Sequence, residues 1–285
     1  MIRQPQSAPT FLGVGLQKAA TTWLHTQLEA HPQVWVPPRK ELHFFDMLEL
    51  PKQHFIAPAV VFQQLRRVAR FLDKLPEADV PAALTELKFW AHMGDEKRNL
   101  DWYRKIWLEF SDPQAKTIGE ITPAYSVLDP KTIEVVRGEG VEKIVLLLRD
   151  PVERTWSQHR MAAGGHPEYS PTFYQRPHVV ARGAIRSIVE NWEAVFGQEN
   201  VFLGMYDSLL VEGGSEVLLR SVCDFLGVDF NLEWFPELGT TFLASTQMSI
   251  PNEARQFLVE AHRADLDFAA ERFGKTGETW RARYL

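Results

Sequence analysis

The sequence predicts an α/β fold in which a central parallel sheet is flanked by helices. Short apolar runs, typical of buried parallel strands, alternate along the chain with segments of helical periodicity. Alternation of this kind favours a parallel sheet with helical crossovers. The chain has 285 residues, of which 45% are hydrophobic and 24% charged, so it is long enough to bury a large core.

Each expected element has its own signal. Helices that pack on the sheet are expected over 21–30 and 151–162, where apolar residues recur at helical spacing. Residues 47–100 contain helical patterns and no clear strand, so we interpret them as a helical insertion between two core strands. Residues 163–184 are rich in Gly, Pro, His, Tyr and Arg without periodicity, which predicts a long surface loop. The predicted strands are 11–15, 33–36, 116–121, 143–148 and 201–206.

Composition excludes several classes of function. The net charge of −6 argues against a nucleic-acid-binding protein, so any anionic ligand needs a local basic pocket. The single cysteine, Cys223, excludes an internal disulfide and a multi-cysteine zinc site. The N-terminus has no apolar signal segment, and no apolar run is long enough to span a membrane. We therefore expect a cytoplasmic protein.

Residues 11–22, FLGVGLQKAATT, read as a strand, a tight loop and the start of a helix. The first N–H groups of a helix lack internal partners and lie at its positive end, so this element suits a phosphate. It is not a Walker A motif, because two alanines separate Lys18 from Thr21. The alternative is an ordinary strand–turn–helix with a solvated lysine.

A second strand-to-helix junction lies at residues 144–161. Arg149 ends the strand, Asp150 is the expected helix N-cap, and Glu153 completes a capping box. Ligands of open α/β sheets bind at this edge, and an arginine and Ser157 could converge there on one phosphate. The alternative is that Arg149 pairs with a carboxylate and Ser157 is merely exposed.

The segment PPRKELHFFD at 37–46 also follows a strand. Glu41 is a candidate general base, because Arg39, Lys40 and His43 beside it would keep it ionised. The alternative is a solvated charge cluster next to a buried phenylalanine pair. His43 and Asp46 have no third ligand at metal-site spacing, so we expect no metal.

In combination, these segments resemble the sulfotransferases that use 3′-phosphoadenosine 5′-phosphosulfate. The nearest likeness is to the branch with the heparan sulfate sulfotransferases and their bacterial relatives. The resemblance implies a P-loop-like three-layer fold, a single sulfotransferase domain over 1–285 with its insertion at about 47–100, and sulfuryl transfer without a metal. The segments that carry it are QKAATTWL at 17–24, KELHFFD at 40–46, ITPAYSVL at 121–128 and LLLRDPVERTWSQHRM at 146–161.

The resemblance also implies residue roles. Arg149 and Ser157 would bind the 3′-phosphate of the donor. Glu41 matches the catalytic base and His43 a histidine near the acceptor, while Lys18 would stabilise charge on the departing phosphate. The residues expected at the 5′-phosphosulfate and nucleotide, through side chains or loop N–H groups, are Gly15, Gln17, Lys18, Ala19, Ala20, Thr21, Thr22 and Trp23.

The chain departs from the family pattern at Ala20, at Ile121, at His159, which sits where the family often has tyrosine, and in one late loop. Ala20 replaces a glycine usual before the loop threonines, and alanine there is strained if the backbone needs a positive φ. Ile121 stands where the glycan-modifying members have a lysine, which argues against a heparan-like acceptor. The late Lys-Gly-Arg nucleotide loop has no convincing copy, and residues 240–249 are the candidate to replace it.

The sequence is also compatible with other functions. The main alternatives are an ATP-dependent P-loop phosphotransferase, which would require Mg²⁺, and a nucleotide-binding protein without catalysis. The acceptor could be a small molecule, a lipid or a carbohydrate, and its reacting group a hydroxyl or an amine. The sequence predicts no oligomeric state.

Overall fold

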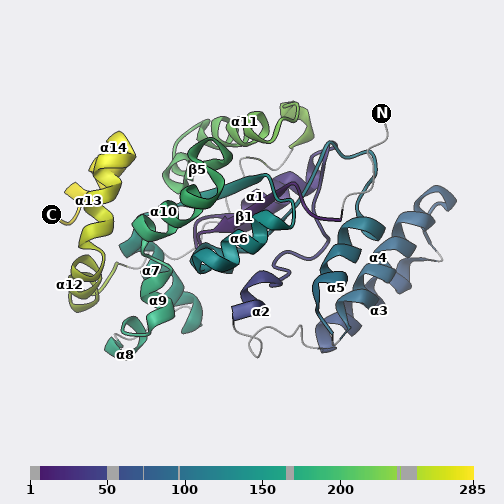
Figure 1. Cartoon of the computed structure of the whole chain (residues 1–285), viewed down its shortest axis with the longest axis horizontal. Helices are drawn as coiled ribbons and strands as arrows, with labels where there is room; N and C mark the ends of the chain where they lie inside the picture. Colours follow the sequence, from purple (N-terminus) through teal and green to yellow (C-terminus); the bar gives the residue numbers. More distant parts are fainter. Residues whose placement is uncertain are drawn as a thin grey trace.

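A five-stranded parallel sheet runs through the part of the chain that the computed structural model describes (Figure 1). Those residues are 7–49, 58–72, 74–95, 97–164, 170–235, 238 and 249–285. The strand order is β2-β3-β1-β4-β5. The predicted strands are all present, although the one expected over 33–36 is confined to two residues at the edge of the sheet. The strands are β1 (Phe11–Gly15), β2 (Val34–Trp35), β3 (Thr117–Ile121), β4 (Lys143–Leu148) and β5 (Val201–Met205).

The central strand β1 is buried along its whole length. It pairs in parallel with β3 on one side and with β4 on the other. Parallel strands that are covered on both faces need apolar residues at every position, which explains why the runs FLGVG and KIVLLL are continuous rather than alternating. The carboxyl ends of β1, β3 and β4 therefore open at one edge, where ligands of such sheets bind.

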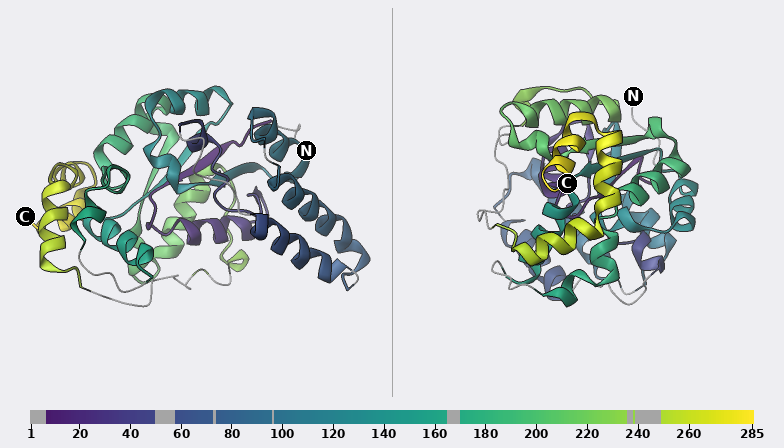
Figure 2. Two further views of the ribbon diagram at one scale, coloured as in Figure 1. Left: turned by 90° about the horizontal axis from the view of Figure 1, so that it is seen from below. Right: turned by 90° about the vertical axis from the view of Figure 1, so that its left-hand side faces the viewer.

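Helices cover both faces of the sheet, as predicted. Figure 2 (left) shows α6 and α10 on one side and α1 and α11 on the other, so the core has three layers. The α-helices up to β4 are α1 (Thr21–Ala30), α2 (Phe45–Glu49), α3 (Pro58–Leu72), α4 (Val80–Met93), α5 (Leu100–Lys105) and α6 (Pro130–Gly138). Those that follow are α7 (Pro151–Ala162), α8 (Pro171–Tyr174), α9 (Pro177–Ala181), α10 (Ile185–Phe196), α11 (Gly214–Leu226), α12 (Asn252–Ala261), α13 (Arg263–Arg272) and α14 (Gly274–Ala282).

The described residues also form short 3₁₀-helices and a π-helix. The 3₁₀ segments are η1 (Glu77–Asp79), η3 (Pro123–Val127), η4 (Gln198–Asn200), η5 (Tyr206–Leu210) and η6 (Leu232–Trp234), and η2 (Ile106–Phe110) is a π-helix.

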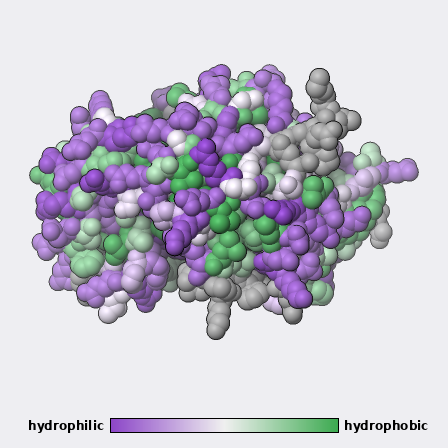
Figure 3. Space-filling view, in the orientation of Figure 1, coloured by the Kyte–Doolittle hydropathy of each residue, from purple (hydrophilic) through white to green (hydrophobic). Residues whose placement is uncertain are grey.

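The two ends of the molecule are helical (Figures 1 and 2). Helices α3 and α4 pack together at one end, and α12, α13 and α14 lie at the other. In the described part of 47–100 the chain forms helices and no strand, in keeping with the predicted helical segment. The surface in Figure 3 is mostly hydrophilic, with hydrophobic side chains gathered near the middle of the face, where α2 and α6 lie.

The predicted long loop over 163–184 is wrong in part. Helices α8 and α9 occupy much of it, and residues 165–169 lie outside the described residues. These helices have only four and five residues, too few for helical periodicity to stand out in a sequence. Within the described ranges, no helix combines the length and the apolar character needed to cross a membrane.

Candidate active site

The predicted phosphate loop connects β1 to α1. Gly15 lets the strand approach η3, because a Cβ there would lie 2.8 Å from the Cβ of Ser126. Lys18 and Ala20 both have a positive φ, 72° and 63°. Ala20 is the N-cap residue of α1, and its side chain makes no hydrogen bond to the N–H groups of the first turn. The first turn of α1 carries no acidic residue, so its N–H groups face the loop without a competing carboxylate.

Lys18 lies among other cations. Partial burial lowers its pKa, and the nearby charges of Arg149, Arg160 and Lys40 lower it further. Its Nζ is 3.8 Å from the sulfur of Met161. Like charges held this close repel one another, and an anion bound between them would relieve that repulsion.

Arg149 reaches the loop directly. Its Nη1 donates a hydrogen bond to the backbone carbonyl of Lys18 at 2.8 Å, and its guanidinium lies 4.3 Å from the ring centre of Tyr206. The carboxylate of Glu153 is 4.0 Å from Nη2, the outer limit of an ion pair. The two basic residues that the sequence placed at the ends of β1 and β4 therefore meet at one place.

Asp150 caps α7 as predicted. Its carboxylate accepts hydrogen bonds from the N–H groups of Val152 and Glu153 at 2.9 and 3.3 Å. Ser157 is buried two turns along this helix. Its convergence with Arg149 on one phosphate stays a prediction.

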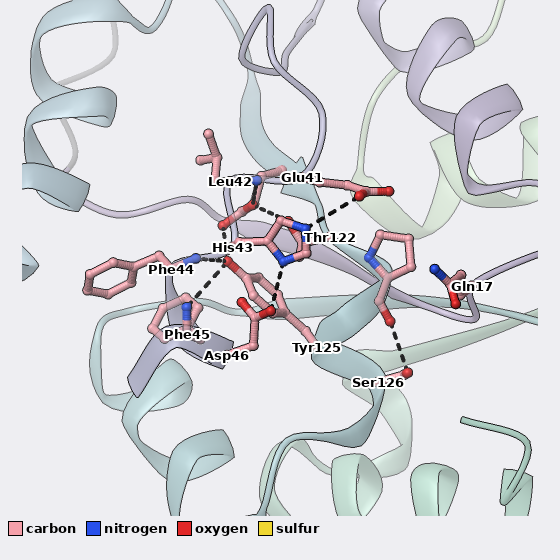
Figure 4. A network of polar contacts seen from close by, with 12 residues as sticks. Gln17, Glu41, Leu42, His43, Phe44, Phe45, Asp46, Thr122, Tyr125 and Ser126 are labelled. Atoms are coloured by element: carbon pink, nitrogen blue, oxygen red, sulfur yellow. Dashed lines mark hydrogen bonds and ion pairs between the residues drawn. The ribbon is translucent and has the colours of Figure 1, made fainter. Parts of the chain in front are cut away.

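Glu41 and His43 lie side by side in the segment between β2 and α2 (Figure 4). The Glu41 carboxylate is 2.7 Å from Lys40 Nζ and 3.4 Å from His43 Nε2. The other ring nitrogen of His43 is 2.7 Å from the Asp46 carboxylate. The imidazole thus bridges two carboxylates.

This arrangement fixes the charges of the two residues. Burial raises the pKa of Glu41, but the bonds from His43 and Lys40 outweigh it and lower the pKa to about 2. Burial lowers the pKa of His43, but Asp46 and Glu41 raise it to about 9. At neutral pH the pair is a carboxylate beside an imidazolium.

Arg182, just after α9, is a residue that the sequence reasoning missed. Its Nη1 donates to the side-chain oxygen of Gln17 in the phosphate loop at 2.9 Å. Burial lowers the pKa of Arg182, while the charges of Asp46 and Glu41 raise it, so this guanidinium lies between the loop and the candidate base. An arginine in a region without periodicity gave no sequence signal.

Two expected binding residues make contacts within the protein, and their roles at the nucleotide stay predictions. Trp23 has 1% of its surface exposed and belongs to the core, with its indole N–H donating to the carbonyl of Leu238 at 3.4 Å. The N–H of Ala19 donates to the carbonyl of Leu16 at 3.1 Å. Residues 240–248, most of the segment expected to replace the late nucleotide loop, lie outside the described residues.

Among the described residues, His, Cys, Asp and Glu side chains form no group of three or more that could hold a metal ion.

Two curated proteins resemble parts of the chain. The membrane-associated sulfotransferase kil1 of Dictyostelium discoideum is 25% identical over 156 residues, which are 54% of this chain and 23% of that protein. Heparan sulfate glucosamine 3-O-sulfotransferase 5 of Mus musculus is 26% identical over 138 residues, 48% of this chain and 38% of that protein. The chain therefore spans well under half the length of these relatives. No family model matches it.

Two solved structures share the fold. A sulfotransferase from Alicyclobacillus acidocaldarius superposes with a TM-score of 0.61 at 23% identity, over 96% of this chain and 98% of that one. The sulfotransferase domain from the curacin biosynthetic pathway gives a TM-score of 0.54 at 17% identity, over 88% and 82%. Parts of the sequence are thus similar to sulfotransferases, and the fold is similar to that of solved sulfotransferase structures.

Proposed function

We propose that the protein is a sulfotransferase that moves the sulfuryl group of 3′-phosphoadenosine 5′-phosphosulfate to an acceptor hydroxyl. The observation that carries the proposal is the hydrogen bond from Arg149 to the Lys18 carbonyl at 2.8 Å. A nucleotide with phosphates at both its 3′ and 5′ positions needs two cationic groups within one ligand's reach. This bond holds the Arg149 guanidinium against the backbone of the loop that carries Lys18, and its charge is close enough to lower the pKa of Lys18, which burial also lowers.

The donor would lie along the phosphate loop. Lys18, the side chains of Thr21 and Thr22, and the uncapped N–H groups at the start of α1 are the proposed partners of the 5′-phosphosulfate. Arg149, with Ser157, is the proposed partner of the 3′-phosphate. The fit rests on an uncapped helix end with no acidic residue in its first turn and on the cations around Lys18.

Glu41 is the proposed general base. The acceptor oxygen attacks sulfur as the bond between sulfur and the bridging phosphate oxygen breaks, which gives the sulfate ester and adenosine 3′,5′-bisphosphate. The acceptor proton passes to Glu41, while Lys18 and the loop N–H groups stabilise the charge on the departing phosphate. The pKa of about 2 makes Glu41 a weak base in the free protein. The negative charge of a bound donor would raise that pKa and strengthen the base.

The acceptor class remains broad. We propose a hydroxyl of a small molecule, a lipid or a carbohydrate. A single catalytic domain over 1–285 and a cytoplasmic location, both expected from the sequence, stay part of the proposal.

Variants of Glu41 and Lys18 test the function. Release of adenosine 3′,5′-bisphosphate from the donor should be measured with a panel of hydroxyl compounds that includes 4-nitrophenol. Glu41→Gln and Lys18→Ala should each lower turnover at least about a hundredfold, because each removes a group that acts in the transition state.

Matched controls come from helix α5 and the π-helix η2 that follows it. Lys105 and Glu109 form an exposed ion pair at 3.6 Å, and Lys105→Ala and Glu109→Gln should leave turnover unchanged. A Glu41→Gln protein with near wild-type turnover would remove Glu41 from the base role. Magnesium-dependent turnover of ATP, with none of the phosphosulfate, would identify a phosphotransferase instead.

A further inference from the structure

The segment that carries Glu41 and His43 has an unusual backbone. Both residues have a positive φ, 67° and 55°. Residues other than glycine adopt this conformation only where their surroundings impose it. The contacts that hold the backbone here therefore decide where the two side chains point.

Four backbone N–H groups of this segment donate hydrogen bonds to residues at the end of β3 and in η3, and Figure 4 draws those from Phe44 and Phe45 to Tyr125. Two acceptors, a buried carboxylate and a buried phenol, take three of these bonds. The bonds run from Glu41 to the Ile121 carbonyl at 3.1 Å, from Leu42 to Glu120 at 3.4 Å, and from Phe44 and Phe45 to the Tyr125 hydroxyl at 2.9 and 3.4 Å.

Glu120 and Tyr125 are linked to each other. The Tyr125 hydroxyl donates to the Glu120 carboxylate at 3.0 Å, and Thr122 donates to the same carboxylate at 2.7 Å. A phenol hydroxyl donates one hydrogen bond and can accept two, so Tyr125 uses its full capacity. Glu120 is 1% exposed and Tyr125 is fully buried, so neither can exchange these partners for water.

We propose that Glu120 and Tyr125 are positioning residues, which act through the backbone of residues 41–45 to aim Glu41 at the acceptor and His43 between Glu41 and Asp46. The proposal rests on the proposed function only in giving Glu41 a catalytic role. The positioning itself is a property of the protein without ligands.

The chain supplies a matched control for Tyr125. The hydroxyl of Tyr103 donates to the same Glu120 oxygen at 2.8 Å and is equally buried, and its ring stacks on Phe44 at 4.4 Å. Tyr103→Phe therefore removes a buried hydroxyl that donates to the Glu120 carboxylate, while the N–H groups of Phe44 and Phe45 keep the Tyr125 hydroxyl as their acceptor. Tyr125→Phe removes that acceptor and leaves both N–H groups unsatisfied.

The test is an NMR titration of the His43 ring, assigned with His43→Gln. In Tyr125→Phe the His43 midpoint should fall by at least about one pH unit, because the imidazole loses its fixed place between two carboxylates. In Tyr103→Phe it should stay within about 0.3 unit of wild type. If 4-nitrophenol accepts sulfate, Tyr125→Phe should lower kcat about tenfold or more, with little change in the KM of the donor.

Equal midpoints in the two variants, whether shifted or not, would overturn the proposal. If Tyr125→Phe fails to fold, hydrogen exchange of the wild-type Phe44 amide decides instead: slow exchange supports the proposal, and exchange at the rate of an open loop overturns it.

Calorimetry with adenosine 3′,5′-bisphosphate separates the positioning proposal from the proposed function. A wild-type protein that does not bind it contradicts the proposed function, while the His43 titration still judges the positioning.

Discussion

At the scale of single residues, the site is defined by which charges lie together. Partial burial and three cationic neighbours lower the pKa of Lys18, whereas two cationic partners lower the pKa of Glu41. The first arrangement leaves room for an anion, and the second keeps a carboxylate ionised. This contrast separates the proposed donor side of the site from the proposed base.

His43 should give the stability of the protein a distinct pH dependence. Its pKa is 6.5 when unperturbed and about 9 in the folded protein, so the stabilisation is complete below 6.5 and is lost as the pH rises through 9. Chemical unfolding of wild type between pH 6.5 and 9 should therefore show a falling free energy of unfolding. His43→Gln should lack this part of the fall.

Glu41 should affect the stability of the protein at acid pH. Its pKa is 4.5 when unperturbed and about 2 in the folded protein, so its stabilisation is present above 4.5 and lost as the pH falls through 2.

The control for the His43 prediction is the exposed His178. His178→Gln should keep the wild-type pH dependence of the unfolding free energy between pH 6.5 and 9. An identical fall in wild type and His43→Gln would refute the charge assignment.

At the scale of elements, the sequence predicted the strands and helices that are marked by a continuous apolar run or by helical periodicity. The runs FLGVG and KIVLLL became β1 and β4, and the meeting of Lys18 with Arg149 followed because neighbouring parallel strands end at one edge. The short α8 and α9 have no such pattern, and the apolar run over 33–36 forms a strand of only two residues, β2. The place of Arg182 and the positive φ of Glu41 depend on contacts between distant segments, which one sequence does not contain.

The N-cap of α7 also joins this helix to the C-terminal region. Asp150 is 2% exposed, and its second carboxylate oxygen accepts from Arg283 at 2.8 Å and from the Tyr284 hydroxyl at 2.9 Å. Burial raises its pKa to about 6, so the carboxylate is ionised at pH 7.5. The residue next to Arg149 is thus tied to a segment more than one hundred positions away.

Two cap variants measure this link. Asp129 caps α6 by accepting from the Thr132 N–H at 2.9 Å and is exposed, so Asp129→Ala should cost about 1 kcal/mol of unfolding free energy. Asp150→Ala loses a cap and also leaves Tyr284 without its acceptor, so it should cost about 3 kcal/mol. Urea unfolding at pH 7.5 compares them, and equal losses would mean that the contacts with Arg283 and Tyr284 contribute nothing.

At the scale of the whole molecule, an acidic chain concentrates positive charge at one edge of its sheet. The net charge is −6, yet the cations around Lys18 are close enough to lower its pKa. A protein of this kind repels polyanions in general and binds an anion only where its site matches the ligand. This distribution of charge is in keeping with the proposed nucleotide ligand, which is small and carries two phosphate groups.

The central claim is that Lys18 and Arg149 bind the same nucleotide, Lys18 at its 5′-phosphate and Arg149 at its 3′-phosphate. Calorimetry of wild type with adenosine 3′,5′-bisphosphate and with 5′-AMP tests it most directly, alongside Arg149→Gln and the control Arg186→Gln, whose arginine pairs with Glu190 at 2.9 Å. We predict that wild type and Arg186→Gln bind the bisphosphate at least about tenfold more tightly than 5′-AMP, and that Arg149→Gln loses this preference. Equal affinity of wild type for the two nucleotides, or an unchanged preference in Arg149→Gln, would contradict the account.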